Sequence, residues 1–206
     1  MIGHFYGDAQ KMILSYVEFI EQVRHDGKVI IRHDLIDQLR PYLSDEKLDQ
    51  LISFGESEEA DYSLKKITRE AGVMIMNWMR SEGEYQSQIP LPGKYNALNA
   101  LAAMAACIEA GKSEMEVAKA IGEFKGIHRR FEKRFENEEV IIIDDYAHHP
   151  TEINAVVEAV RWLYPNRRLV GVFQSHTYTR TRDFMIEFAD SLKNLDVLYT
   201  CELYAA

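Results

Sequence analysis

The sequence predicts an α/β protein built from two parts. Short apolar runs typical of buried strands alternate with segments whose apolar residues recur at helical spacing, near the start of the chain and again after residue 140. Between these regions, residues 62–89 change to the two-residue period of antiparallel strands. We therefore expect an α/β domain over residues 1–127 with a small antiparallel region, followed by a Rossmann-like α/β domain over residues 128–206.

The first part contains helical and strand patterns in a mixed order. Ser113 and Glu116 have the spacing of a capping box, which marks a helix start. Residues 81–83 (Ser-Glu-Gly) provide a hairpin turn between two strand patterns. Three methionines and one tryptophan, Met74, Met76, Trp78 and Met79, are interpreted as strand residues that fill the core. Helices are expected over residues 8–24, 35–42, 95–110 and 113–124, and strands over 28–32, 51–55, 62–67, 72–80 and 84–89.

The second part has the order strand, helix, strand, helix, strand. Strands are expected over residues 140–143, 168–173 and 197–201, with helices over 152–164 and 182–192. Such a run predicts a parallel sheet with right-handed crossovers. The segments that follow the first two strands should then lie side by side at the carboxyl edge of the sheet, where open α/β sheets bind ligands.

Charge and composition argue against a nucleic-acid-binding protein, a disulfide-stabilised protein and a membrane protein. The net charge of −9 over 206 residues argues against a general nucleic-acid binder, which normally carries a basic face. Cys107 and Cys201 lie far apart in sequence, so we expect no disulfide framework and a reducing compartment. No run has the length of a membrane-spanning helix, and the start of the chain lacks the pattern of a signal peptide. These features favour a cytoplasmic protein without a membrane partner.

Residues 144–152 (Asp-Asp-Tyr-Ala-His-His-Pro-Thr-Glu) form the strongest candidate site. They follow an apolar strand pattern and precede a helix whose first turn suits Pro150. An acidic loop that caps a helix would explain any one of these residues. The gathering of carboxylates, a phenol and imidazoles at one junction favours a ligand site.

Two further groups have a structural and a functional interpretation. Asn96 and Asn99 lie one helical step apart, where two amides could recognise a purine edge or merely cap the helix. Arg129 and Arg130 lie between the two parts, where they could bind phosphate or form a solvated turn.

Four motifs together resemble the Mur ligase family. They occur in the family's order and span Gly93 to Thr181, and the doubled aspartate and histidine are most similar to members that join L-alanine to UDP-N-acetylmuramate. The motifs are residues 92–103 (Pro-Gly-Lys-Tyr-Asn-Ala-Leu-Asn-Ala-Leu-Ala-Ala), 124–132 (Phe-Lys-Gly-Ile-His-Arg-Arg-Phe-Glu), 144–152 and 173–181 (Phe-Gln-Ser-His-Thr-Tyr-Thr-Arg-Thr).

This resemblance implies a partial central ATP-binding domain, most of a C-terminal domain, and an ATP- and Mg²⁺-dependent ligase of peptidoglycan precursor synthesis. Such enzymes convert the muramoyl carboxylate to an acyl phosphate, which the amino group of L-alanine attacks. The expected substrates are UDP-N-acetylmuramate, L-alanine and ATP. By position, the ATP-binding residues would be Asn96, Asn99, Arg130 and Asp145, and the residues for the amino acid would be Tyr146, His148, His176 and Arg180, with His148 and Arg180 catalytic. The resemblance assigns no metal ligand to this chain and no oligomeric state.

The sequence also departs from the family. Tyr95 replaces a usual histidine, Ser175 a usual proline and Thr177 a frequent arginine. The chain has no Gly-x-x-Gly-Lys-[Ser/Thr] phosphate loop, and the central-domain glutamate that binds metal in the family is missing. We therefore expect these residues to be inactive by themselves. A peptide-adding member of the family and a non-catalytic relic that keeps a nucleotide or amino-acid pocket remain alternatives.

Overall fold

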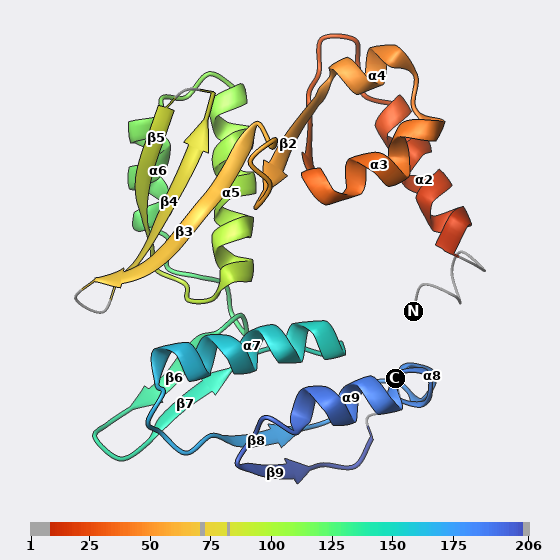
Figure 1. Cartoon of the computed structure of the whole chain (residues 1–206). Helices are drawn as coiled ribbons and strands as arrows, with labels where there is room; N and C mark the ends of the chain where they lie inside the picture. Colours follow the sequence, from red (N-terminus) through yellow and green to blue (C-terminus); the bar gives the residue numbers. More distant parts are fainter. Residues whose placement is uncertain (1–8, 71–72, 82, 204–206) are drawn as a thin grey trace. The chain divides into compact units, whose positions relative to one another are not determined.

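The computed structural model describes residues 9–70, 73–81 and 83–203 (Figure 1). The chain forms two compact units. The first unit ends at Pro90 and also includes Asn96–Phe124. The second unit contains Leu91–Tyr95 and the residues from Lys125 onward. The α/β class predicted from the sequence is confirmed, since both units combine helices and strands.

The first unit is built on one five-stranded sheet in the order β1-β2-β3-β4-β5. β1, β2 and β3 run parallel, whereas β3, β4 and β5 are antiparallel, so the predicted antiparallel region is confirmed. The β4–β5 turn joins Arg80 to Gly83, as the hairpin pattern predicts. The strands are β1 (Val29–Arg32), β2 (Leu51–Gly55), β3 (Tyr62–Glu70), β4 (Val73–Arg80) and β5 (Gly83–Ile89).

Two helices, α5 (Lys94–Glu109) and α6 (Glu114–Gly122), lie against this sheet (Figure 1). Ser113 caps α6 in the predicted capping box with Glu116. The core between helices and sheet buries Met76, Trp78 and Leu101 almost completely. Each such side chain contributes about 1.5–3 kcal/mol through removal from water. The methionine-rich strand is therefore a core strand, as expected.

The amino-terminal elements differ from the predicted pattern. Helix α2 (Ala9–Glu21) is shorter than expected, and Asp8 lies outside the described residues. The single helix expected over residues 35–42 is wrong, and Pro41, which has no N–H to donate, lies in the last of the short turns that replace it. The chain forms three short turns there and one unpredicted helix: the 3₁₀ turns η1 (His33–Leu35) and η2 (Arg40–Tyr42), with α3 (Ile36–Leu39) between them, and then α4 (Asp45–Asp49).

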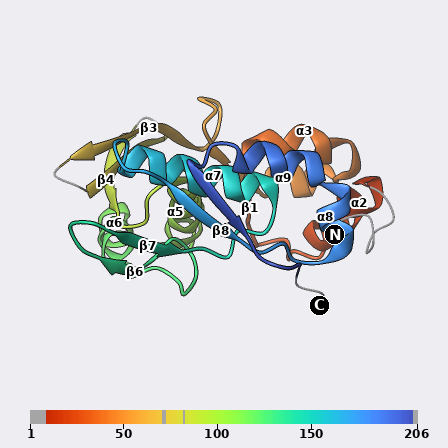
Figure 2. The same cartoon turned by 90° about the horizontal axis from the view of Figure 1, so that it is seen from below.

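The second unit carries the candidate site. An unpredicted strand, β6 (Glu132–Glu136), pairs antiparallel with β7 (Ile141–Asp144). Helix α7 (Pro150–Leu163) leads to β8 (Val170–Phe173), which pairs in parallel with β9 (Val197–Thr200) as predicted. Figure 2 shows α7 and α9 on one side of β8 and β9, where Phe173 packs on Phe188 of α9 at 5.5 Å between ring centroids.

The helix expected over residues 182–192 is divided in two. Phe184 separates helix α8 (Tyr178–Asp183) from helix α9 (Met185–Leu192). Phe184 has the non-helical angles φ −119° and ψ 25°. Its ring lies edge-on to His149, with centroids 4.9 Å apart, so packing against the start of α7 accompanies this break.

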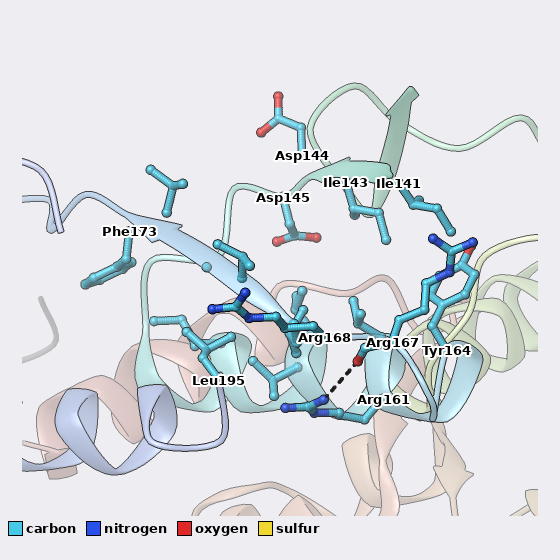
Figure 3. A pocket seen from close by; sticks show the side chains of 18 of the residues that line it. Ile141, Ile143, Asp144, Asp145, Arg161, Tyr164, Arg167, Arg168, Phe173 and Leu195 are labelled. Carbon is cyan, nitrogen blue, oxygen red and sulfur yellow. Dashed lines mark hydrogen bonds between the residues drawn. The ribbon is translucent and has the colours of Figure 1, made fainter. Parts of the chain in front are cut away.

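The expected continuous parallel sheet is wrong in one respect. Among the described residues, β6–β7 and β8–β9 form separate two-stranded sheets, and β7 is not hydrogen-bonded to β8. A cavity of about 490 Å³ lies between them, lined by both strands and by apolar side chains of α7 such as Val157 and Val160 (Figure 3). A crossover helix determines the direction of the next strand, but it does not require the two strands to be neighbours.

No helix among the described residues has the length and apolar character needed to cross a membrane.

Candidate functional site

The loop between β7 and α7 is the centre of the candidate site, as the sequence predicts. β7 ends at Asp144 and α7 begins at Pro150. His149 caps the helix: its ring nitrogen accepts a hydrogen bond from the N–H of Thr151 at 3.3 Å. The Glu152 carboxylate accepts the N–H groups of His148 and His149 at 2.9 and 3.2 Å. These bonds satisfy donors at the helix start and hold the preceding loop in place.

Asp145 connects this loop to residues 128–132, which lie at the start of the second unit. One carboxylate oxygen accepts the N–H of Phe131 at 2.8 Å, and the other accepts that of Ala147 at 2.7 Å. Burial raises the pKa of the Asp145 carboxyl, although the two N–H groups and the Arg130 charge oppose this rise. A carboxylate offers about four acceptor positions. Asp145 therefore keeps acceptor capacity for a ligand hydroxyl.

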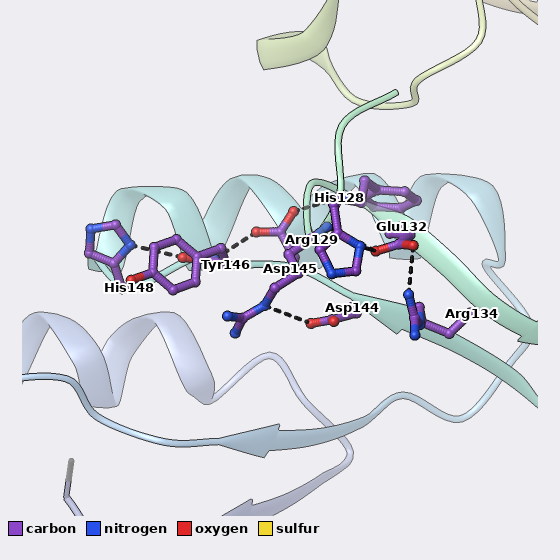
Figure 4. Close-up of polar contacts among 10 residues, drawn as sticks. His128, Arg129, Glu132, Arg134, Asp144, Asp145, Tyr146 and His148 are labelled. Carbon is purple, nitrogen blue, oxygen red and sulfur yellow. Dashed lines mark hydrogen bonds and ion pairs between the residues drawn. The ribbon is translucent and has the colours of Figure 1, made fainter. Parts of the chain in front are cut away.

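Residues 128–132 form a turn with positive φ angles at two non-glycine residues (Figure 4). Arg129 and Phe131 adopt φ values of +56° and +48°, which non-glycine residues rarely do. The Glu132 carboxylate holds the turn by accepting the N–H of Arg129 at 2.9 Å. That bond, followed by those from Arg134 and His128, lowers the pKa of Glu132 to about 2.

Tyr146 lies between two side chains from different segments. The Arg129 guanidinium is 4.7 Å from the centre of its ring, and the His148 ring is 5.1 Å away, centroid to centroid (Figure 4). The N–H of Tyr146 also donates to the carbonyl of Arg129 at 2.8 Å. The phenol ring is thus held in place while about 42% of the residue remains exposed.

His148 and Arg180 are brought together from two elements. Nδ1 of His148 lies 2.8 Å from the carbonyl of Tyr146 and 3.4 Å from the Glu152 carboxylate. The Arg180 guanidinium donates to the carbonyl of His148 at 3.5 Å, which is long for such a bond. Arg180 is 3% exposed, and it lies within α8, whereas the sequence placed it in a turn before a helix.

A buried guanidinium normally has an anionic partner, because an unpaired buried charge is costly. Among the described residues, no carboxylate lies within ion-pair distance of Arg180. Arg182, by contrast, is exposed and pairs with its neighbour Asp183 at 2.8 Å, so it faces solvent.

The other predicted site residues, His176 and the two asparagines, differ in how far they are exposed to solvent. His176 is partly buried in the segment between β8 and α8, before Thr177, whose φ is +67°. Asn96 and Asn99 lie in the first turns of α5 in the first unit, where Asn96 is buried and Asn99 is exposed. The three-residue step therefore gives the two amides unequal exposure.

The sequence did not identify Glu132 as part of the site, and it assigned Arg130 to ATP while giving Arg129 no separate role. Glu132 organises the backbone of the turn, and Arg129 covers Tyr146. The only sequence signal was a glutamate shortly after two arginines. In the described part of the chain, no three His, Cys, Asp or Glu side chains gather as a metal site.

Comparison with known proteins places both units in one family. The model of the Mur ligase middle domain matches residues 3–107, and the model of the Mur ligase glutamate ligase domain matches residues 129–205. The chain is 38% identical over 202 residues to a UDP-N-acetylmuramate–L-alanine ligase of Christiangramia forsetii and 36% identical over 203 residues to one of Porphyromonas gingivalis. These alignments cover 98% of this chain but only 42% and 44% of the two relatives.

Solved structures show the same fold. A UDP-N-acetylmuramate–alanine ligase of Thermotoga maritima superposes with a TM-score of 0.78 at 25% identity, over 98% of this chain and 43% of the other. A MurF ligase of Thermotoga maritima in complex with ADP superposes with a TM-score of 0.75 at 19% identity, over 95% and 45%. At 19% identity, the second likeness concerns the fold alone.

Proposed function

Because the chain belongs to the Mur ligase family, we propose that it is part of an ATP-dependent ligase that joins L-alanine to UDP-N-acetylmuramate in peptidoglycan precursor synthesis. The relatives that are 34–38% identical over nearly the whole chain carry this name. The observation that carries the proposal is the buried Arg180 without a carboxylate partner among the described residues. An amino acid would supply that carboxylate and pair with the guanidinium.

The proposed reaction has two steps. The terminal phosphoryl group of ATP moves to a carboxylate oxygen of the muramoyl group, which gives an acyl phosphate and ADP. The neutral amino group of L-alanine then attacks the acyl carbon, and inorganic phosphate leaves as the amide forms. Positioning and electrostatic stabilisation provide most of the catalysis in phosphoryl transfer. The roles of this chain are therefore to bind and orient the reactants.

The second unit would hold the amino acid and part of the nucleotide. Arg180 would bind the alanine carboxylate, while His148 and His176 would orient the amino group with Tyr146 beside them. Asp145 would accept hydrogen bonds from the ribose hydroxyls, for which its remaining acceptor positions suffice.

The remaining contacts to ATP follow the motif positions. Arg130 would reach the phosphates, and Asn96 and Asn99 would meet the adenine. Mg²⁺ is proposed to accompany the ATP phosphates, although the described residues offer no group of His, Cys, Asp and Glu side chains that could hold it. We also propose that the enzyme acts in the cytoplasm, where its exposed thiols Cys107 and Cys201 would stay reduced.

The chain spans less than half of the length of these relatives, and it has no phosphate loop in its sequence. We therefore propose that these residues are inactive by themselves. A suitable test protein is a chimera in which they replace the corresponding part of the Christiangramia forsetii ligase. Phosphate release by the chimera should require ATP, UDP-N-acetylmuramate and L-alanine together, and the isolated chain should release none.

Two results would contradict this proposal. A folded chimera that binds ATP but prefers the cell-wall tripeptide to L-alanine would favour a peptide-adding ligase. A folded chimera that binds nucleotide or alanine without any phosphate release would favour a non-catalytic relic.

A further inference from the structure

We propose that Arg129 is a positioning residue for the amino-acid end of the site, acting through the Tyr146 ring on His148. The identity of the amino acid rests on the proposed function, but the positioning itself rests on the geometry of the second unit. Arg129 differs in this respect from its neighbour Arg130, whose charge acts on Asp145 at the nucleotide end.

The backbone of Arg129 is held by its positive φ angle and by two hydrogen bonds. Its φ of +56° turns the chain, so that two successive arginines can point to different partners. Its N–H donates to the Glu132 carboxylate at 2.9 Å, and its carbonyl accepts the N–H of Tyr146 at 2.8 Å. The position of the Arg129 side chain is therefore set by its own turn and by the loop that carries Tyr146.

The side chain of Arg129 then restrains the Tyr146 ring. Its guanidinium lies 4.7 Å from the ring centre, within the distance of a cation–π interaction. Its Nε is 3.8 Å from the Asp144 carboxylate, which keeps the guanidinium at this end of the loop. Figure 4 shows Arg129 and His148 on different sides of the Tyr146 ring.

The Tyr146 ring in turn contacts His148. Its ring is 5.1 Å from that of Tyr146, and its Nδ1 contacts the Tyr146 carbonyl at 2.8 Å. Its own carbonyl accepts the Arg180 guanidinium at 3.5 Å. Movement of the Tyr146 ring would therefore change the position of the His148 imidazole, whose own backbone contacts the buried guanidinium.

The first test uses the 206-residue chain itself, with its histidine rings labelled for NMR. Arg129→Ala should shift the ring signals of His148, and Arg129→Lys should shift them less, since an ammonium can also lie over a phenol ring. Arg134→Ala is the matched control, because the Arg134 side chain is 50% exposed like that of Arg129 and also contacts Glu132. Unchanged signals from Trp162 in α7, together with those from Trp78 in the first unit, would show that both units of the variants are folded. Equal His148 shifts in Arg129→Ala and Arg134→Ala would overturn the proposal.

The second test uses the chimeric ligase and separates two adjacent residues. Arg129→Ala should raise the KM for L-alanine by about two- to fivefold, as expected for the loss of an exposed cation–π contact, with the KM for ATP unchanged. Arg130→Ala should raise the KM for ATP and leave that for L-alanine unchanged. If Arg129→Ala raises the KM for ATP as much as that for alanine, Arg129 is not a positioning residue for the amino-acid end.

The two tests also separate this inference from the proposed function. A chimera that never uses L-alanine would contradict the proposed function, while the NMR result would still decide whether Arg129 positions His148.

Discussion

Arg180 and Arg182 lie on the same short helix but in opposite environments, so they provide the sharpest comparison between single residues. Arg180 is buried, whereas the side chain of Arg182 is 74% exposed and pairs with Asp183. Loss of a buried charge-assisted contact costs roughly 2–5 kcal/mol, and an exposed pair contributes little.

In the chimeric ligase, Arg180→Ala should therefore raise the KM for L-alanine by at least about thirtyfold, as follows from a cost of roughly 2 kcal/mol or more. Arg182→Ala should leave it nearly unchanged. His148→Ala should also weaken alanine use, while Asp145→Ala should act mainly on the KM for ATP. Equal effects of the two arginine variants on alanine would show that the pocket is assigned incorrectly.

Glu132 provides a prediction about the pH dependence of folding stability. Its folded-state pKa of about 2 lies below the ordinary value of 4.5. Its ionised form therefore stabilises the fold above about pH 4.5, and this contribution is lost as the pH falls toward 2. Urea unfolding at pH 6.5 and pH 3 should show that Glu132→Gln lowers the free energy of unfolding more at the higher pH. The same loss at both pH values would mean that the carboxylate charge is not what holds the turn.

Motifs identified the residues of the β7–α7 loop correctly as neighbours at a strand–helix junction. They could not identify the contacts of Arg129 and Glu132, because those contacts depend on a turn with positive φ at non-glycine residues. Local sequence preference disfavours such a turn, and only the surrounding loop stabilises it. The roles of the individual site residues stay predictions.

Among elements, helices with clear capping signals were predicted within a few residues. α6 and its capping box show this, as does α7 with Pro150 in its first turn. The helix over residues 182–192 was not predicted correctly, because Phe184 packs on His149 and leaves helical geometry. β6 was missed because charged residues dominate its sequence and most of its side chains are exposed.

The separation of β7 from β8 leads to a measurable difference between strands. β4 is flanked by β3 and β5, whereas β7 and β8 each have one ladder among the described residues and one edge toward the cavity. Edge amides open more easily than central ones. Hydrogen exchange of the isolated chain should therefore be faster in residues 141–144 and 170–173 than in residues 73–80. Equal protection in these three segments would mean that β7 and β8 close against each other in solution.

For the whole molecule, the fold class followed from the alternation of strand and helix patterns, and both family models agree with it. The division after residue 127 stays a prediction. Periodicity could not reveal whether β7 and β8 are neighbours, since each strand's pattern depends only on which of its faces are buried. The chain spans less than half of the length of the relatives that it matches, so the activity of a whole ligase stays a proposal.

We propose that the chain belongs to an L-alanine-adding ligase that works through an acyl phosphate. The most direct measurement supplies the chimera with UDP-N-acetylmuramate labelled with ¹⁸O in the muramoyl carboxylate, and follows the released phosphate by mass spectrometry. One labelled oxygen should appear in the phosphate for each amide formed, only when L-alanine is present, and Arg180→Ala should suppress both products at limiting alanine. Phosphate without the label, or labelled phosphate that forms without any alanine amide, would contradict this mechanism.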